Sequence, residues 1–266
     1  MRKVFNTSTG TKFLIGVSGL ALVVFLVLHL GGNLTFLGGP DTFNAYAHKL
    51  TGSPLIYVFE AGLLSIFLLH ALKAVTSYVS NRRARGTQGY AKVAGSHLTQ
   101  KKPNAGSRKN LASSTSILSG IVIIVFLIIH LKGLKFGHSE HYMVADGTQV
   151  RNLYATQVDY FRNPGIVALY VASVGLIGMH LWHGIWSAFQ SLGLLNTRLA
   201  PGVVRAGQAF SLILTLGFMF VPVYTHLAYL GRPAEAPKHA VSTPETVRDT
   251  PPAVGAGGGI QTEGHR

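Results

Sequence analysis

Long apolar stretches separated by polar or basic connections dominate the chain. Five of these stretches carry few or no charges, and they reach the roughly 20 residues that an α-helix needs to cross a hydrocarbon core of about 30 Å. No stretch of about ten residues alternates apolar and polar side chains, which disfavours a transmembrane β-barrel. The pattern therefore predicts an all-α integral membrane protein in which residues 1–231 form one domain with five transmembrane helices. The expected spans are residues 13–37, 54–79, 111–132, 164–190 and 207–230.

The composition agrees with a membrane protein and removes several kinds of chemistry. Charged residues make up 12% of the chain and hydrophobic residues 48%, whereas soluble domains carry about 25% charged residues. The chain has no cysteine, which excludes disulfides, thiolate zinc sites and iron–sulfur clusters held by this chain. A net charge of +14 would suggest nucleic acid as the partner of a soluble protein. Here the basic residues lie between the apolar stretches, so we expect membrane lipid and no nucleic acid as a partner.

The distribution of Lys and Arg predicts the orientation, because cytoplasmic connections are enriched in both. The N-terminal end and the second and fourth connections together hold 13 basic and no acidic residues. We therefore expect a multi-pass protein of the bacterial inner (plasma) membrane, with its N-terminus inside and its C-terminus outside. The strongly basic second connection either serves only as this signal or also faces anionic lipid or a partner subunit. Residues 232–266, rich in Pro, Gly, Ala and Thr, are predicted to be a disordered extension on the outer side.

Each of the first four spans carries a histidine well past its midpoint. An ionisable side chain is costly inside a membrane, so these histidines are functional candidates; they are His29, His70, His130 and His180. With about 1.5 Å of rise per residue, His29 and His130 lie near the outer side, and His70 and His180 lie toward the inner side. Paired imidazoles can ligate the iron of b-type haem, and a four-helix bundle can hold them in its core. We therefore predict that the first four helices form a bundle around two haems b, the outer one held by His29 and His130 and the inner one by His70 and His180.

Two alternatives to this assignment stay open. His183 lies three residues after His180 and shares much of the same helix face, so either is a candidate for the fourth ligand. The same histidines could also form a proton or metal pathway without haem. However, the sequence has no inverted repeat and no paired, broken helices of the kind found in many transporters.

The residues around the histidines resemble a known family. His29 lies in the run VLHLGGN, His70 opens HALKA, His130 ends IIH, and residues 179–193 read MHLWHGIWSAFQSLG. Together with the five spans and their orientation, these stretches resemble the cytochrome b558 membrane-anchor subunit of succinate dehydrogenase/fumarate reductase, in its five-helix, two-haem group. The resemblance covers residues 10–230. In that family the first and third spans share one haem, and the second and fourth spans share the other.

The resemblance also bears on the fourth span. The family's ligand there precedes a glycine by four residues, a spacing that His180 and Gly184 match and His183 does not. Some fumarate reductases of the family carry a glutamate two residues before this ligand, as part of a transmembrane proton path. The corresponding residue here is Gly178. This difference argues against that path and favours the direction of succinate oxidation.

The resemblance implies an electron path, with no succinate chemistry on this chain. A flavoprotein subunit with covalent FAD and an iron–sulfur subunit, both on the inner side, would pass electrons from succinate through the two haems to a quinone, with menaquinone favoured. Such a complex serves the respiratory chain and the tricarboxylic acid cycle. The alternatives are a di-haem cytochrome b subunit of a hydrogenase or formate dehydrogenase, and a histidine-based transporter of protons or metal.

Three further residues are candidates for roles in such a path. Glu60, the only acid within a span, is a candidate proton donor for the quinone, and a wet carboxylate at the membrane interface is the alternative. Lys73, one turn beyond His70, would pair with a propionate of the inner haem or extend to lipid phosphates. His226, near the outer end of the fifth span, is either interfacial or in contact with the quinone.

Overall fold

The computed structural model describes residues 7–85, 116–137, 140–144 and 147–231. Within these ranges, five helices are long and apolar enough to cross a membrane. They are α1 (Ser8–Leu34), α3 (Leu55–Arg85), α6 (Ser116–His130), which continues as the π-helical turn η3 (Leu131–Lys135), α8 (Pro164–Ser191) and α9 (Ala200–Tyr229). The expectation of an all-α membrane protein with five spanning helices is confirmed to this extent. The predicted tail at 232–266 and most of the basic second connection lie outside the described residues.

Local sequence determines where these helices begin. At the start of α1, the Thr7 side chain accepts a hydrogen bond of 3.1 Å from the Gly10 amide. At the start of α8, the Asn163 side chain accepts one of 2.8 Å from the Gly165 amide, and Pro164 occupies a first-turn position where the missing amide proton costs nothing. Along the spans the side chains are mostly apolar, and a helix satisfies all backbone hydrogen bonds without water.

Four of the spanning helices form a ring, and the fifth packs on its outside. Contacts between neighbours run from α1 to α3, from α3 to α6, from α6 to α8, and from α8 back to α1. α1 and α6 therefore lie on one diagonal of the ring, and α3 and α8 lie on the other. α9 packs against α8 and α1. No side chain of α3 from residue 55 to residue 84 is buried, so this helix leaves most of its surface available to lipid.

Close packing between α8 and α9 depends on glycine. A Cβ atom at Gly178 would overlap with the side chain of Thr215, and one at Gly207 would lie 3.1 Å from Cγ2 of Ile185. The Gly178 carbonyl also accepts a hydrogen bond of 2.8 Å from the Ser211 hydroxyl. A glutamate at position 178 has no room in this arrangement, so the packing of α8 on α9 accounts for the glycine at this position.

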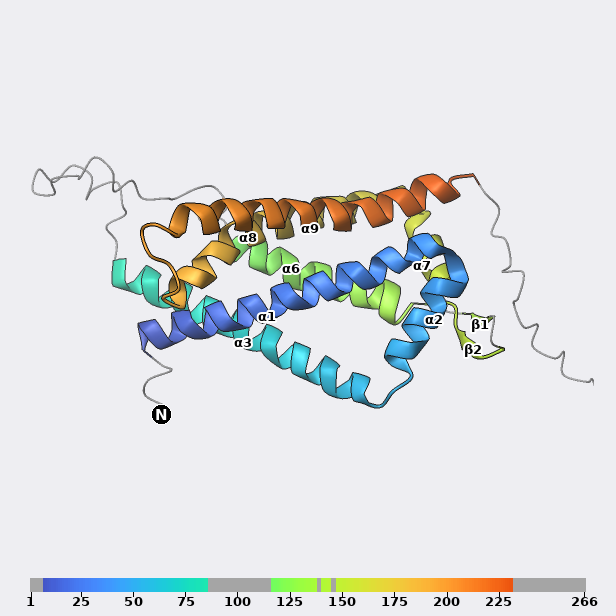
Figure 1. Ribbon diagram of the computed structural model, residues 1–266, viewed down its shortest axis with the longest axis horizontal. Helices are drawn as coiled ribbons and strands as arrows, with labels where there is room; N and C mark the ends of the chain where they lie inside the picture. The colour runs from blue at the N-terminus through green and yellow to red at the C-terminus, as the bar shows by residue number, and fades with distance from the viewer. Residues whose placement is uncertain (1–6, 86–115, 138–139, 145–146, 232–266) are drawn as a thin grey trace, which may run out of the picture.

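A cap that the sequence pattern did not predict lies at one end of the ring (Figure 1). It joins the connection between the first two spans to the connection between the third and fourth. Its elements are the 3₁₀ turn η2 (Thr35–Gly38), α2 (Gly39–Thr51), the antiparallel strands β1 (His141–Met143) and β2 (Gln149–Arg151), and α7 (Leu153–Phe161). The two three-residue strands are a small departure from the all-α expectation.

Buried polar and aromatic contacts hold the cap together. Asn44 of α2 is fully buried, donates to the Asn152 side-chain oxygen at 3.1 Å and accepts from the Tyr154 amide at 2.9 Å. The Phe36 ring stacks on Tyr154, with 4.3 Å between ring centroids. Buried polar groups are costly without partners, so this network holds α2 and α7 in one relative position.

A side-chain hydrogen bond links the hairpin to α2. The Tyr142 hydroxyl donates to the Asp41 carboxylate at 2.7 Å. Burial, together with the negative charge of Asp41, raises the pKa of Tyr142 to about 12. This hydrogen bond therefore requires a protonated phenol.

Candidate functional site

The inner histidine pair lies across one diagonal of the ring. His70 on α3 and His180 on α8 have ring centroids 6.4 Å apart and ring planes at 72° to each other. Two imidazoles that bind one metal ion through bonds of about 2 Å place their ring centroids about 6 Å apart. His70 and His180 are therefore close enough that both could hold one metal ion.

A serine from the other diagonal contacts each ring of this pair. Ser18 on α1 is buried, and its hydroxyl donates to the Leu14 carbonyl at 2.6 Å. Because a hydroxyl has one proton, Ser18 accepts from Nδ1 of His70, which lies 3.2 Å away. This contact holds His70 in the tautomer whose Nε2 has the lone pair needed to bind a metal. On α6, the buried Ser119 hydroxyl lies 3.0 Å from Nδ1 of His180.

The outer pair lies across the other diagonal. His29 on α1 and His130 on α6 have ring centroids 5.7 Å apart and ring planes at 84°. The Tyr170 hydroxyl lies 3.4 Å from Nδ1 of His130. Phe25 stacks on His29 at 5.3 Å, and the Phe126 ring lies 5.8 Å from that of His130. The structure thus brings the four candidate histidines together two by two, each ring beside one from the opposite helix.

An internal repeat underlies this arrangement. Residues 18–29 read SGLALVVFLVLH and residues 119–130 read SGIVIIVFLIIH. The serine and histidine of each copy are 11 residues apart, which is about three helical turns, so both side chains share one face of their helix. In each copy, the serine contacts a histidine of the inner pair, and the histidine belongs to the outer pair. The sequence analysis considered only ionisable residues within the spans and therefore did not identify Ser18 and Ser119. Both serines occupy the same position in the repeat, which could have identified them as candidates.

The donor set fits haem better than a bare metal ion. In the part of the chain that the structure describes, no group of three or more His, Asp or Glu side chains could hold a metal ion. A zinc-like ion takes three or four protein ligands, whereas haem iron has four macrocycle nitrogens and needs at most two from the protein. Gly19 leaves room for the His70 ring, because a Cβ atom there would lie 3.1 Å from its Cε1.

The ring of His183 contacts a different residue from the ring of His180. Its ring lies edge to face with Trp186, with 5.4 Å between centroids. Its buried Nδ1 has no hydrogen-bond partner among the described residues. Because His180 is the residue beside His70, the geometry favours His180 as the ligand.

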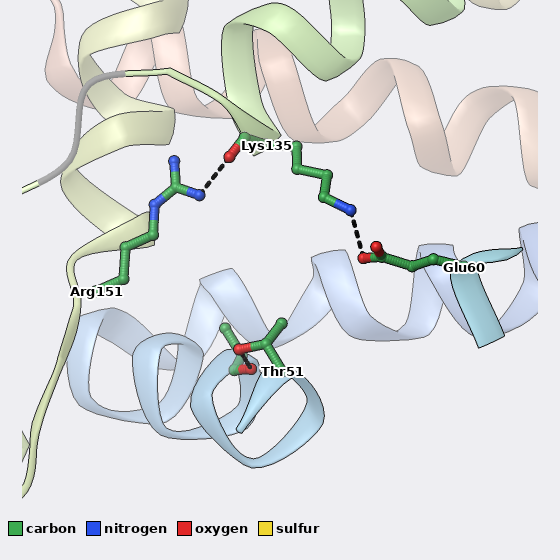
Figure 2. A network of polar contacts seen from close by, with 5 residues as sticks. Thr51, Glu60, Lys135 and Arg151 are labelled. Carbon is green, nitrogen blue, oxygen red and sulfur yellow. Dashed lines mark hydrogen bonds and ion pairs between the residues drawn. The ribbon is translucent and has the colours of Figure 1, made fainter. Parts of the chain in front are cut away.

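Glu60 has a partner that the sequence did not reveal. It forms an ion pair with Lys135 at the end of η3, and both side chains are 39% exposed (Figure 2). Arg151 of β2 donates to the main-chain carbonyl of Lys135 and to those of Leu134 and Gly137, so it caps the end of the third span. The partial exposure and the ion pair of Glu60 are consistent with a hydrated carboxylate at the membrane interface. The role of Glu60 as a proton donor stays a prediction.

The other two candidates lie on α3 and α9. Lys73 is half-buried on α3, three residues after His70, and its contact with a haem propionate stays a prediction. His226, near the end of α9, donates from Nδ1 to the Phe161 carbonyl at 2.9 Å.

Comparison of the chain with protein-family models, with curated proteins and with solved structures found no match. What the chain does is therefore inferred from the two histidine pairs and the residues around them.

Proposed function

We propose that the chain is the di-haem cytochrome b membrane anchor of a succinate:quinone oxidoreductase, in a bacterial inner membrane with its N-terminus inside. The observation that carries the proposal is the pairing of four membrane histidines across the two diagonals of a helix ring. His29 and His130 would hold an outer haem b, and His70 and His180 an inner one. When bound, the two haems would supply one-electron carriers between the two sides of the membrane.

The chain's own contribution is to hold and orient the ligands and to exclude water. Ser18 accepts from Nδ1 of His70, which makes the opposite ring nitrogen a stronger ligand. Phe25 and Phe126 lie against the outer histidines, and the apolar spans keep the surroundings at low dielectric. Burial and hydrogen bonding of the ligands are the means by which a protein adjusts haem potentials.

The partners follow from the resemblance of residues 10–230 to the b558 anchors. Because the chain has no cysteine, the iron–sulfur clusters would belong to an iron–sulfur subunit and the FAD to a flavoprotein subunit. Both would dock on the inner side, where the basic residues of the N-terminal end and of the second and fourth connections would face them. The electron acceptor would be a quinone, with menaquinone favoured.

Purification of the full chain in mild detergent, with whatever binds it in its host, tests this proposal. A flavoprotein with covalent flavin and an iron–sulfur subunit should co-purify, and succinate should reduce added quinone. In His70→Ala, succinate oxidation with a water-soluble dye should persist while quinone reduction is lost, because only the quinone path uses the histidine pairs. His48→Ala is the matched control, since His48 is exposed on α2. Hydrogenase or formate dehydrogenase subunits in place of the expected pair would assign the chain to the alternative di-haem class.

A further inference from the structure

The two copies of the repeat on α1 and α6 differ immediately after their histidines. After His29, α1 continues as an α-helix, and the Asn33 side chain donates to the His29 carbonyl at 2.8 Å. After His130, the chain forms the π-helical turn η3, in which the Phe136 amide donates to the Leu131 carbonyl at 2.9 Å. π-Helical turns are rare and frequently lie at functional sites, so the groups that hold this turn bear on the ligand before it.

Arg151 of β2 reaches the turn from the cap and donates to three of its main-chain carbonyls (Figure 2). They are those of Leu134 at 3.0 Å, Gly137 at 3.2 Å, and Lys135. The last carbonyls of a helix have no partner within the helix, and a cation beside them is favourable. The first of the three carbonyls is about one turn beyond His130. Arg151 therefore joins the hairpin to the end of the third span, next to an outer ligand.

The turn and the ligand share their aromatic neighbours. A Cβ atom at Gly133 would overlap with the Tyr160 ring, which packs directly on the turn. Tyr160 also packs edge to face on Tyr170, with 5.8 Å between ring centroids, and the Tyr170 hydroxyl lies 3.4 Å from Nδ1 of His130. A shift of the turn would therefore change the surroundings of the His130 ring.

The positive charge of Arg151 is not balanced at this end of α6. Lys135 pairs with Glu60, whereas Arg151 is half-buried and forms no ion pair among the described residues. Burial lowers the pKa of Arg151, but the group stays charged because an arginine is not deprotonated in a protein. Such a charge is screened less than one in water, and it stabilises a nearby group that gains an electron.

We propose that Arg151 is a positioning residue for the outer haem. It holds the π-helical turn behind His130 and so orients this ligand, and its charge raises the midpoint potential of the haem that His130 would hold. The inference rests on the proposed function and adds a role for the cap, which reaches the ligand helix through one side chain.

The test compares Arg151→Gln and Arg151→Lys with wild type in the full purified complex. The matched control is Lys49→Gln, which removes an exposed positive charge from the cap on α2. Redox titration gives the midpoint potential of each haem, and the electron paramagnetic resonance signal of ferric haem reports the orientation of its ligands. Hydrogen exchange of the amides of residues 131–137 reports opening of the turn, whether or not haem is bound.

The two Arg151 variants separate the charge from the geometry. Arg151→Gln should lower the midpoint potential of the outer haem, shift its resonance signal and increase amide exchange in the turn roughly tenfold or more, because bonds from a charged donor are lost. Arg151→Lys keeps the charge but not the planar guanidinium, so it should shift the signal and increase exchange while keeping most of the potential. The inner haem in all variants, and every readout in Lys49→Gln, should stay as in wild type.

The outcomes also separate this inference from the proposed function. With both haems present, an unchanged outer potential and resonance signal in Arg151→Gln would overturn the inference and leave the haem anchor intact, even if exchange were faster. An equal fall of the potential in Lys49→Gln, or an equal change in both haems, would overturn it as well. A wild-type chain without haem would refute the proposed function, and equal exchange in Arg151→Gln and wild type would then refute the hold of Arg151 on the turn.

Discussion

Replacing Ser18 with alanine tests the role of the serines in holding the inner histidines. Ser18 is buried on α1 and accepts from Nδ1 of His70 at 3.2 Å while donating to the Leu14 carbonyl. Alanine removes this acceptor and leaves the His70 ring with its hydrogen bond to the Ile15 main chain. Loss of one hydrogen bond costs about 0.5–1.5 kcal/mol. Removal of a group that orients a metal-binding histidine typically weakens metal affinity by about 10–100-fold, which corresponds to about 1.4–2.7 kcal/mol.

We therefore expect Ser18→Ala to bind the inner haem roughly 10–100-fold more weakly and to retain the outer haem. The inner haem that remains should have a higher midpoint potential, because a less basic imidazole stabilises ferric iron less. Haem content is measured per chain over a series of added haem concentrations, and potentials by redox titration. The control is Ser65→Ala on α3, whose hydroxyl bonds to the Ala61 carbonyl at 2.7 Å and is exposed. Equal haem affinity and potential in Ser18→Ala and wild type, or the same loss in Ser65→Ala, would refute the reasoning.

Three further predictions concern the ligands and the cap. His70→Ala should lose the inner haem and keep most of the outer haem spectrum, whereas His183→Ala should keep both; retention of both haems in His70→Ala would disprove the pairing. Asn44→Ala removes two buried hydrogen bonds, so it should lower the free energy of unfolding by about 2–5 kcal/mol, measured by denaturation in detergent; an unchanged midpoint would count against the buried network. The folded-state pKa of Tyr142 is about 12, above its ordinary value of about 10, so the stability that Tyr142 contributes should be complete below pH 10 and be lost as pH rises from about 10 to 12. Tyr142→Phe, which cannot bond to Asp41, should not show this part of the pH dependence in thermal unfolding; the same alkaline loss in both proteins would contradict the assignment.

The spans and the histidine pairs were accessible from the sequence for a physical reason. A lipid-exposed chain must satisfy its backbone hydrogen bonds within a helix, so apolar length alone predicts the five helices. An ionisable residue is rare in such a helix, so a histidine past the midpoint of each of the first four spans was conspicuous. The relative depths of His29, His70, His130 and His180 then follow from the direction of each helix.

The cap and the serines were harder to predict. The strands of the cap are three residues long, too short for an alternating pattern, and its key contact joins Asn44 to Asn152, which are 108 residues apart. The ion pair of Glu60 likewise depends on a π-helical turn that brings Lys135 to the start of α3. Ser18 is a small polar residue in a membrane helix, where bonding to its own helix is an ordinary role. Its contact with His70 requires knowledge of how two helices face each other.

Haem stoichiometry tests the central claim most directly. The full chain, purified in mild detergent with its bound partners, is assayed as the pyridine haemochrome against protein measured by amino-acid analysis. Two haems b per chain are expected, falling to about one in His70→Ala and in His29→Ala, with a different haem lost in each. A folded wild-type chain that contains no haem b would contradict the claim, and the histidine pairs would then belong to a proton or metal pathway.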